Sequence, residues 1–349
     1  MIRQTLLSGI MLGLCACQTS TETRVSSTHT LPVAVSNHAV AQVRYLADDW
    51  WFIFNGLNAG KTWQDISNSG FYFHQGRWHS LAMPAQVKPV LASVAIGVKS
   101  SVYLIGGYTV AEDHTEVSTP YIYRLDVPDL SWHLETTMPT PVDDTVVVNY
   151  QERYLYLISG WHDTDNVNLV QVYDLQTKTW KQATPFPLPA VFGHAGGIID
   201  NRIVICDGVK VVYVGEKKSF EPSPACAVGE INTEDVTQIN WSVIDHYSGV
   251  ANYRMAARSD AELGIVFAGG SDNPYNYNGV GYNGIPSKAS GDIRIYDVNN
   301  DNWRIIRDHT KATMDHRGLL QSDGYFHILG GMHDPQTVSD EVVSFSLVK

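Results

Sequence analysis

The chain has 349 residues, of which 44% are hydrophobic and 17% are charged. This composition excludes wholesale disorder, and the length fits one large all-β or α/β domain or two smaller ones. The net charge of -12 argues against nucleic acid as a partner, although a local cationic pocket can still bind an acidic substrate.

The first 17 residues resemble a secretory signal. They read "MIRQTLLSGIMLGLCAC", with one cation, a short apolar run and then small residues, and the run is too short to span a bilayer. The ending "LCAC" resembles a bacterial lipoprotein box, which assigns Cys17 as the lipidated residue; ordinary secretion is the alternative. Residues 18–30 read as a flexible tether, and Gln18 resembles lipoproteins sorted to the outer membrane. We therefore expect an envelope lipoprotein that faces the periplasm and contacts the membrane only through its anchor.

Short apolar runs that end in glycine recur six times along the rest of the chain. They are "WWFIFNG" (50–56), "VYLIGG" (102–107), "YLYLISG" (154–160), "RIVICDG" (202–208), "GIVFAGG" (264–270) and "YFHILGG" (325–331). Their last glycines lie roughly 50–60 residues apart, and another apolar segment stands about ten residues before each run, a period typical of repeat folds. A tryptophan follows five of the runs, at Trp78, Trp132, Trp180, Trp241 and Trp303.

Each repeat therefore predicts four short strands: an inner one, a glycine-ended one, a tyrosine-bearing one and a tryptophan-bearing one. The pattern resembles kelch repeats, which implies an all-β, six-bladed propeller over residues 31–349. The repeated glycines and tryptophans are interpreted as structural. The sixth repeat lacks a tryptophan strand, so we expect residues 29–36 to complete its blade and close the ring as a monomer.

Besides Cys17, the chain contains two cysteines, Cys206 and Cys226. In an oxidising compartment such a pair predicts one disulfide. It would close a loop of about 20 residues, worth roughly 3 kcal/mol in the chain-entropy model. Two free buried thiols are the alternative interpretation.

In a propeller, the loops that enter the inner strands and those that leave the second strands share one face. Single polar residues at strand ends are often turns or caps, but a ring of His, Arg and Asp also supplies acid–base groups and cations for a carboxylate. Before the inner strands stand His38, Asp143, Asp144, His194, Tyr253, Arg254, Asp315, His316 and Arg317. After the second strands stand His114, His162, Asp163, Asp207, Lys210, Asp272, His333 and Asp334.

The loop "SDNPYNYNGVGYNGIPS" (271–287) leaves a second strand and therefore belongs to the same face. Tyrosine rings stack on sugars, and asparagine amides both donate to and accept from hydroxyls, so Tyr275, Tyr277 and Tyr282 indicate carbohydrate binding. The alternative is that these tyrosines pack the loop onto itself.

A narrower resemblance concerns the fifth repeat. "IVFAGG", the Asn/Tyr/Gly-rich loop and "SGDIRIYDVNNDNW" resemble the N-acetylneuraminate epimerase (sialate mutarotase) family, periplasmic kelch propellers that need no metal. The resemblance implies ring opening of an acidic sugar: one group removes the anomeric proton, another protonates the ring oxygen, and an arginine holds the carboxylate. The family's glutamate base is absent, because its place reads "CDGVK" (206–210); Asp207, Glu216 or Glu221 would have to replace it.

On this hypothesis the catalytic residues are His194, Arg254, His316 and Asp207. The substrate-binding residues are Tyr253, Arg317, His162, Asp163, Asp272, Tyr275, Tyr277 and His333.

Other functions fit the same residues. A uronate-specific polysaccharide lyase would use His194, Tyr253 and Arg254, and a non-catalytic module would bind glycans or proteins on this face. A copper-radical oxidase is disfavoured, because its cross-linked cysteine would have to come from the predicted disulfide. Zinc spacings, phosphate loops and nucleophile elbows do not stand out, so we expect no cofactor and no metal. A bound ion among Asp163, Asp272 and Asp334 is the alternative.

Overall fold

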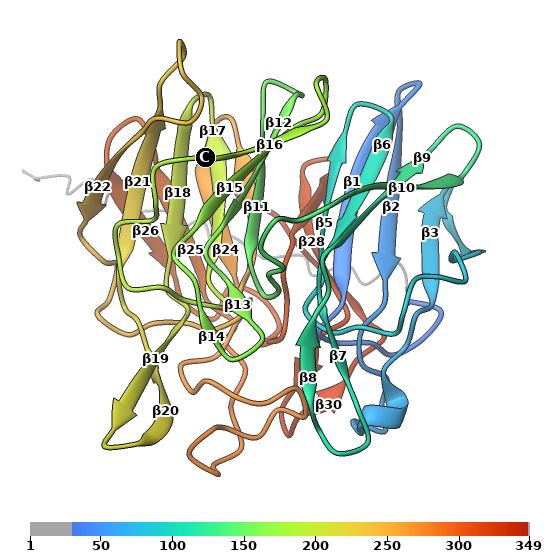
Figure 1. Ribbon diagram of the computed structural model, residues 1–349. Coiled ribbons are helices and arrows are strands. Elements are labelled where there is room, and N and C mark those ends of the chain that lie inside the picture. The colour runs from blue at the N-terminus through green and yellow to red at the C-terminus, as the bar shows by residue number, and fades with distance from the viewer. Residues whose placement is uncertain (1–29, 348–349) are drawn as a thin grey trace, which may run out of the picture.

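The computed structural model describes residues 30–347, which fold into six antiparallel sheets arranged as the blades of a propeller (Figure 1). The predicted six-bladed, all-β architecture is confirmed. The signal segment, Cys17 and residues 18–29 of the tether lie outside the described residues. Within that described range, no helix is long and apolar enough to cross a membrane.

The inner two strands of each blade pair antiparallel, and the second strand carries the glycine-ended apolar run. The innermost strands are β1 (Ala39–Tyr45), β5 (Val94–Val98), β11 (Val146–Tyr150), β17 (Ala195–Ile199), β23 (Ala256–Asp260) and β27 (Leu320–Ser322). The second strands are β2 (Asp48–Phe54), β6 (Ser101–Ile105), β12 (Tyr154–Ile158), β18 (Arg202–Cys206), β24 (Gly264–Ala268) and β28 (Tyr325–Leu329).

The outer two strands complete each blade. The third strands are β3 (Gly70–His74), β9 (Tyr121–Asp126), β15 (Val170–Asp174), β21 (Cys226–Ile231), β25 (Ile293–Asp297) and β31 (Val342–Phe345). The fourth strands are β4 (Arg77–Leu81), β10 (Ser131–Thr137), β16 (Thr179–Gln182), β22 (Ile239–Ile244) and β26 (Asn302–Ile306). All five repeated tryptophans lie in fourth strands, as the sequence predicts.

Four of these tryptophans tie each blade to the one before it. The indole N–H of Trp132 donates to the carbonyl of Ala82 at 3.0 Å, just past the outer strand of the preceding blade. Trp241 and Trp303 make the corresponding bond to the carbonyls of Thr184 and Asp245, at 3.3 and 2.9 Å. The indole N–H of Trp180 donates instead to the Thr136 hydroxyl on β10 at 3.2 Å. Trp78 of the first blade has a buried indole N–H without a partner, because residues 30–347 supply no fourth strand to the sixth blade that precedes it.

The ring closes between the start of the described chain and the sixth blade. Thr30 forms an antiparallel bridge with Glu341, and Leu31 N–H donates to the carbonyl of Asp340 at 2.7 Å. Val35 N–H then donates to Ser339 at 3.0 Å. The segment predicted as a strand over 29–36 therefore contacts the last blade through a bridge and loop hydrogen bonds, and residues 31–35 are not extended strand.

The connections between second and third strands project from one face of the ring, the lower one in Figure 1. They form four small hairpins and a short 3-10 helix, η1 (Trp63–Asp65). The hairpins pair β7 (Tyr108–Val110) with β8 (Glu116–Ser118), β13 (Trp161–His162) with β14 (Asp165–Asn166), β19 (Val209–Val214) with β20 (Lys217–Pro222), and β29 (Met332–His333) with β30 (Thr337–Val338).

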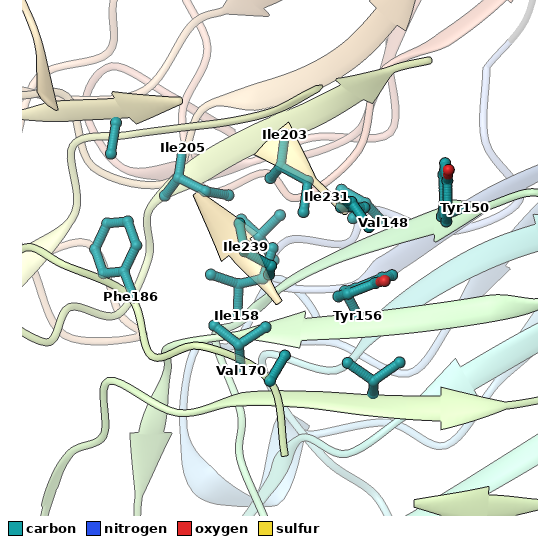
Figure 2. Close-up of a cluster of buried hydrophobic side chains, with 14 of the residues drawn as sticks. Val148, Tyr150, Tyr156, Ile158, Val170, Phe186, Ile203, Ile205, Ile231 and Ile239 are labelled. Atoms are coloured by element: carbon teal, nitrogen blue, oxygen red, sulfur yellow. The ribbon is translucent and has the colours of Figure 1, made fainter. Parts of the chain in front are cut away.

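Apolar clusters fill the spaces between neighbouring blades. Figure 2 shows one of them, in which Tyr156 and Ile158 of the third blade pack with Ile203 and Ile205 of the fourth. All four side chains are fully buried, and burial of each such side chain stabilises the fold by roughly 1.5–3 kcal/mol. The hydroxyl of Tyr156 reaches the carbonyl of Val236 at 2.7 Å, so its polar end is also satisfied.

A closed circle of backbone hydrogen bonds surrounds the propeller axis. One residue just before each inner strand adopts a left-handed backbone, with φ between 48° and 72°: Asn37, Ala92, Asp144, Gly193, Arg254 and Asp315. We call these six residues the axial ring. Each of the first five donates its N–H to the ring residue of the preceding blade, at 2.8–3.3 Å, and the N–H of His316 donates to Arg254 at 3.0 Å. This circle fixes the backbone position of each ring residue, and it therefore determines which groups the side chain of that residue can contact.

Cys206 and Cys226 form the predicted disulfide. They lie opposite one another on β18 and β21, and both are fully buried. The alternative of two free thiols is therefore wrong.

We expect the disulfide to stabilise the fold by restricting the unfolded chain. Its half-cystines are 20 residues apart, so the double variant Cys206→Ala/Cys226→Ala should lower the free energy of unfolding by about 3 kcal/mol. Urea denaturation of both proteins, with and without reductant, measures this. Reductant should shift the wild-type midpoint alone; equal midpoints for the two proteins would contradict the prediction.

Candidate functional site

Four charged side chains meet on the axis within the ring. Arg254 donates through Nε and Nη2 to Asp144 Oδ2, at 2.9 and 2.7 Å, and through Nη1 to Asp315 Oδ1 at 3.0 Å. Arg317 pairs with the other oxygen of Asp144 at 2.9 Å. Each of the four side chains is at most 6% exposed. We call Asp144, Arg254, Asp315 and Arg317 the ion cluster; its two cations and two carboxylates balance.

Burial and ion pairing shift the pKa values of the ion cluster in opposite directions. For Asp144, the adjacent Arg254 and Arg317 outweigh burial and hold the pKa below its usual value. For Asp315, burial prevails over the same two cations and raises the pKa. The two carboxylates raise the pKa of Arg254, although burial opposes them. Arg254 therefore stays charged at any ordinary pH.

Arg254 was assigned to a substrate carboxylate from the sequence, but its guanidinium already bonds two carboxylates of this chain. The rings of Tyr253 and Tyr275 lie beside it, with centroids 4.6 and 5.5 Å from Cζ. Both tyrosines are fully buried. They act as packing around the ion cluster, and Tyr275 belongs to an apolar cluster that covers this end of the axis.

The histidines beside the ring are buried and neutral. Burial lowers the pKa of His38 to about 3 and that of His194 to about 4, and it places that of His316 well below its ordinary value. His194 donates from Nε2 to the carbonyl of Ile158 at 2.8 Å. The predicted pair His194 and His316 is thus brought close to the ion cluster, but beneath the apolar cover.

Asp207 has a separate environment. Its carboxylate accepts from His246 Nε2 at 2.6 Å, from the Tyr247 hydroxyl at 2.5 Å and from the backbone N–H of Asn252 at 3.0 Å. These contacts attach the end of β18 to the segment that leads into the fifth blade. The hydrogen bonds of the Asp207 carboxylate therefore reach none of the other predicted catalytic residues.

The remaining predicted residues lie on the hairpins and loops of the same face. Asp163 accepts from the Ser118 N–H at 3.0 Å, and His162 donates from Nδ1 to the carbonyl of Pro141 at 2.7 Å. Asp272 is exposed and His333 is half-buried. Of the tyrosines in the 271–287 loop, only Tyr277 and Tyr282 line an open space.

That space is a cavity of about 180 Å³ on the hairpin face, directly above the ion cluster. We call it the cap cavity. Its walls come from the second to the fifth blades: Tyr108, Glu116, Asp143, Asp144, Trp161, Phe192, Phe220, Arg254, Asn276, Tyr277 and Tyr282. The loop that carries these tyrosines therefore folds over the axis, and its Tyr282 packs against Phe220 of β20.

Aromatic rings make up one side of the cap cavity. Tyr282 stacks on Phe220 with centroids 4.2 Å apart, and Trp161 meets Phe192 edge to face at 5.3 Å. The ring of Tyr277 is half-buried. Flat apolar rings of this kind offer the surface on which the C–H faces of a sugar pack.

Two carboxyl groups also line the cap cavity. Asp143 is buried and accepts from the Ser118 hydroxyl at 2.6 Å; burial raises its pKa well above the ordinary value. Glu116 keeps an exposed surface at the rim, but burial of its carboxyl raises its pKa too, against the nearby Arg254. Each group can therefore hold or release a proton nearer neutrality than a free carboxyl.

Sequence reasoning missed Glu116. Its motif "AEDHTE" drew attention to His114 instead, and only the β7–β8 hairpin brings Glu116 beside Asp143. Among residues 30–347, no group of three or more His, Cys, Asp or Glu side chains has an arrangement that could hold a metal ion.

Removal of Arg254 should destabilise the protein strongly. The variant Arg254→Gln leaves two buried carboxylates without this partner, which costs about 3–5 kcal/mol. Addition of Asp144→Asn should cost less than the sum of the single changes, by roughly 0.5–3 kcal/mol of coupling. Urea denaturation measures both values, with the exposed Arg77→Gln as a control within about 0.5 kcal/mol of wild type. Additive effects would rule out the coupling.

Asp143 should make stability depend on pH. Its folded pKa is above the unfolded value of 3.8, so the native state binds more protons, and the free energy of unfolding falls as pH rises above about 4. Between about pH 5 and pH 8, Asp143→Asn should lose less stability than the wild type. The exposed Asp272→Asn is the matched control and should follow the wild type. Identical pH slopes for all three proteins would refute this role of Asp143.

Comparison with known proteins gives the fold its family context. No protein-family model matches the chain. It is 24% identical over 170 residues to a putative F-box/kelch-repeat protein of Arabidopsis thaliana, across 48% of this chain and 40% of that protein. It is 26% identical over 166 residues to Kelch-like protein terF of Aspergillus terreus, across 47% of this chain and 32% of that protein. The chain thus spans less than half the length of both relatives.

Among solved structures, YjhT has the same fold. The TM-score is 0.70 over 92% of this chain and 97% of YjhT, with 14% sequence identity, so the likeness concerns the fold alone. The repeats, the six blades and these similarities agree: the chain is a six-bladed β-propeller of the kelch-repeat type.

Proposed function

We propose that the cap cavity binds a single sugar ring and interconverts its anomers by acid–base ring opening. The observation that carries this proposal is the combination, in one cavity, of aromatic walls with two carboxyls whose pKa values are raised, Glu116 and Asp143. Aromatic rings bind the apolar faces of a sugar, and the carboxyls exchange protons with its oxygens.

In this mechanism Asp143, the more deeply buried carboxyl, is the acid and Glu116 is the base. Glu116 removes the proton of the anomeric hydroxyl while Asp143 donates a proton to the ring oxygen. The bond between the ring oxygen and the anomeric carbon breaks, which leaves an open-chain aldehyde. Reclosure on the other face of the carbonyl reverses both proton transfers and returns each carboxyl to its starting state.

The size and the charge of the cavity limit the ligand. At about 180 Å³ it is smaller than most small-molecule sites, roughly 300–1,000 Å³, which favours one ring over a polymer and disfavours the polysaccharide lyase. The cations of the ion cluster are already balanced. We therefore propose a neutral sugar for this cavity, in place of the acidic sugar that the family resemblance implies.

We further propose that the protein acts as a monomer in the cell envelope, attached through Cys17, because the N-terminal sequence has the features of a lipoprotein signal. A non-catalytic glycan-binding role is the second candidate. Its support is the hydrogen bond from Ser118 to Asp143, which already occupies one of the two carboxyls.

NMR distinguishes these functions. Saturation-transfer spectra of the purified protein would be recorded with glucose, galactose, N-acetylglucosamine and glucuronate, and exchange spectroscopy would follow anomer interconversion in the same samples. A neutral sugar should bind and its anomers should exchange faster than in buffer. Glu116→Gln should retain binding but slow the catalysed exchange by roughly 10²-fold.

The control variant is Glu234→Gln, which changes an exposed glutamate outside the cavity and should behave as wild type. Binding without faster exchange would identify a recognition module. Absence of binding by every sugar, or unchanged exchange in Glu116→Gln, would overturn the proposal.

A further inference from the structure

A second cavity lies on the axis beyond the ion cluster. It is a channel of about 370 Å³ enclosed by the inner strands of the blades, and it shares no lining residue with the cap cavity. Its polar lining consists of Gln42, Thr145, Asn149, His194, Arg258, Ser259 and Arg317. Two glycines of β17, Gly196 and Gly197, also line the channel.

The lining of the channel includes two arginines and no aspartate or glutamate. Arg317 is balanced by Asp144. Arg258 is different: its Nε and Nη1 donate to the amide oxygens of Gln321 and Gln42, at 3.3 and 3.1 Å. These partners are neutral, and burial lowers the pKa of Arg258 although Asp49 and Asp260 oppose it. The channel therefore contains a half-buried cation whose direct hydrogen-bond partners carry no charge.

A second observation also indicates a ligand. Two buried polar atoms of the lining have no partner: Arg317 Nε and His194 Nδ1. The His194 side chain donates from Nε2 to Ile158, so Nδ1 is left as an acceptor, whereas Arg317 Nε–H is a donor. Buried polar groups without partners are costly, and each one in a native fold calls for an explanation.

We infer that the channel binds a small oxyanion, a carboxylate or a phosphate, at Arg258. The anion replaces a neutral amide oxygen at the guanidinium, and the planar guanidinium can bind a carboxylate or a phosphate through two parallel hydrogen bonds, which adds both energy and geometric specificity. A ligand with hydroxyl groups also reaches Arg317 Nε and His194 Nδ1 toward the ion cluster. The volume of the channel is within the range of small-molecule sites, roughly 300–1,000 Å³. Because the chain carries a net charge of -12, such a ligand requires a local cation.

The site is tested by isothermal titration of the full chain with phosphate and with gluconate at low ionic strength. We expect at least one of them to bind to the wild type, and Arg258→Gln to weaken that binding at least tenfold. Arg258→Lys keeps the charge but loses the planar guanidinium, so its affinity for the anion should lie between those of the wild type and Arg258→Gln. Arg77→Gln, which removes an exposed arginine on β4, should bind as wild type.

Phosphate binding alone, or gluconate binding alone, supports the site and identifies the source of the oxyanion. Absence of binding by both, or equal affinity of Arg258→Gln and wild type, overturns the inference. If the variants do not fold, NMR spectra of the wild type with ¹⁵N-labelled glutamine test whether the anion binds at Arg258. Titration of the anion should shift the side-chain amide signals of Gln42 and Gln321, and unshifted signals would overturn the inference as well.

Discussion

The circle of backbone hydrogen bonds around the axis is the constraint on which the rest of the structure depends. It requires a left-handed residue in every blade, a conformation that costs a non-glycine residue roughly 1–2 kcal/mol. Gly193 meets this requirement without strain, and a Cβ there would lie 1.9 Å from the ring of Tyr253. At Arg254, φ is 55°, and the strain is offset by the carboxylates that its side chain reaches only from this position.

The ion cluster that results divides the axis into two chemically different spaces. On the hairpin side, Asp144 and Arg254 form the floor of an aromatic cavity with two protonatable carboxyls. On the other side, Arg317 lines a channel whose charged residues are both cations and whose other walls are largely apolar. The proposed sugar chemistry needs a neutral floor, and the proposed anion site needs an unbalanced cation. The pairing of charges neutralises Arg254, whereas Arg258 lies outside the ion cluster and its direct hydrogen-bond partners are neutral amides.

The sequence predicted the blades because each repeat carries its own strand periodicity, glycine and tryptophan within about 50 residues. It also placed the polar residues on one face, since their positions in the repeat are equivalent. It could not predict the partners of these residues. Arg254 and Asp144 are 110 residues apart, and no local pattern indicates that the Arg254 side chain points inward to the carboxylates of Asp144 and Asp315. Glu116 was missed for a related reason, because its position beside Asp143 depends on the orientation of the β7–β8 hairpin relative to the axis.

The four residues of the ion cluster also limit how this sequence can diverge. Loss of any one of them leaves an opposite charge buried, so a single replacement is costly, whereas the joint replacement of a cation and a carboxylate by apolar residues of similar volume is far less so. Among distant relatives these positions should therefore vary together. A natural homologue that has lost Arg254 should also have changed Asp144 or Asp315, and such covariation would be a record of this cluster in evolutionary history.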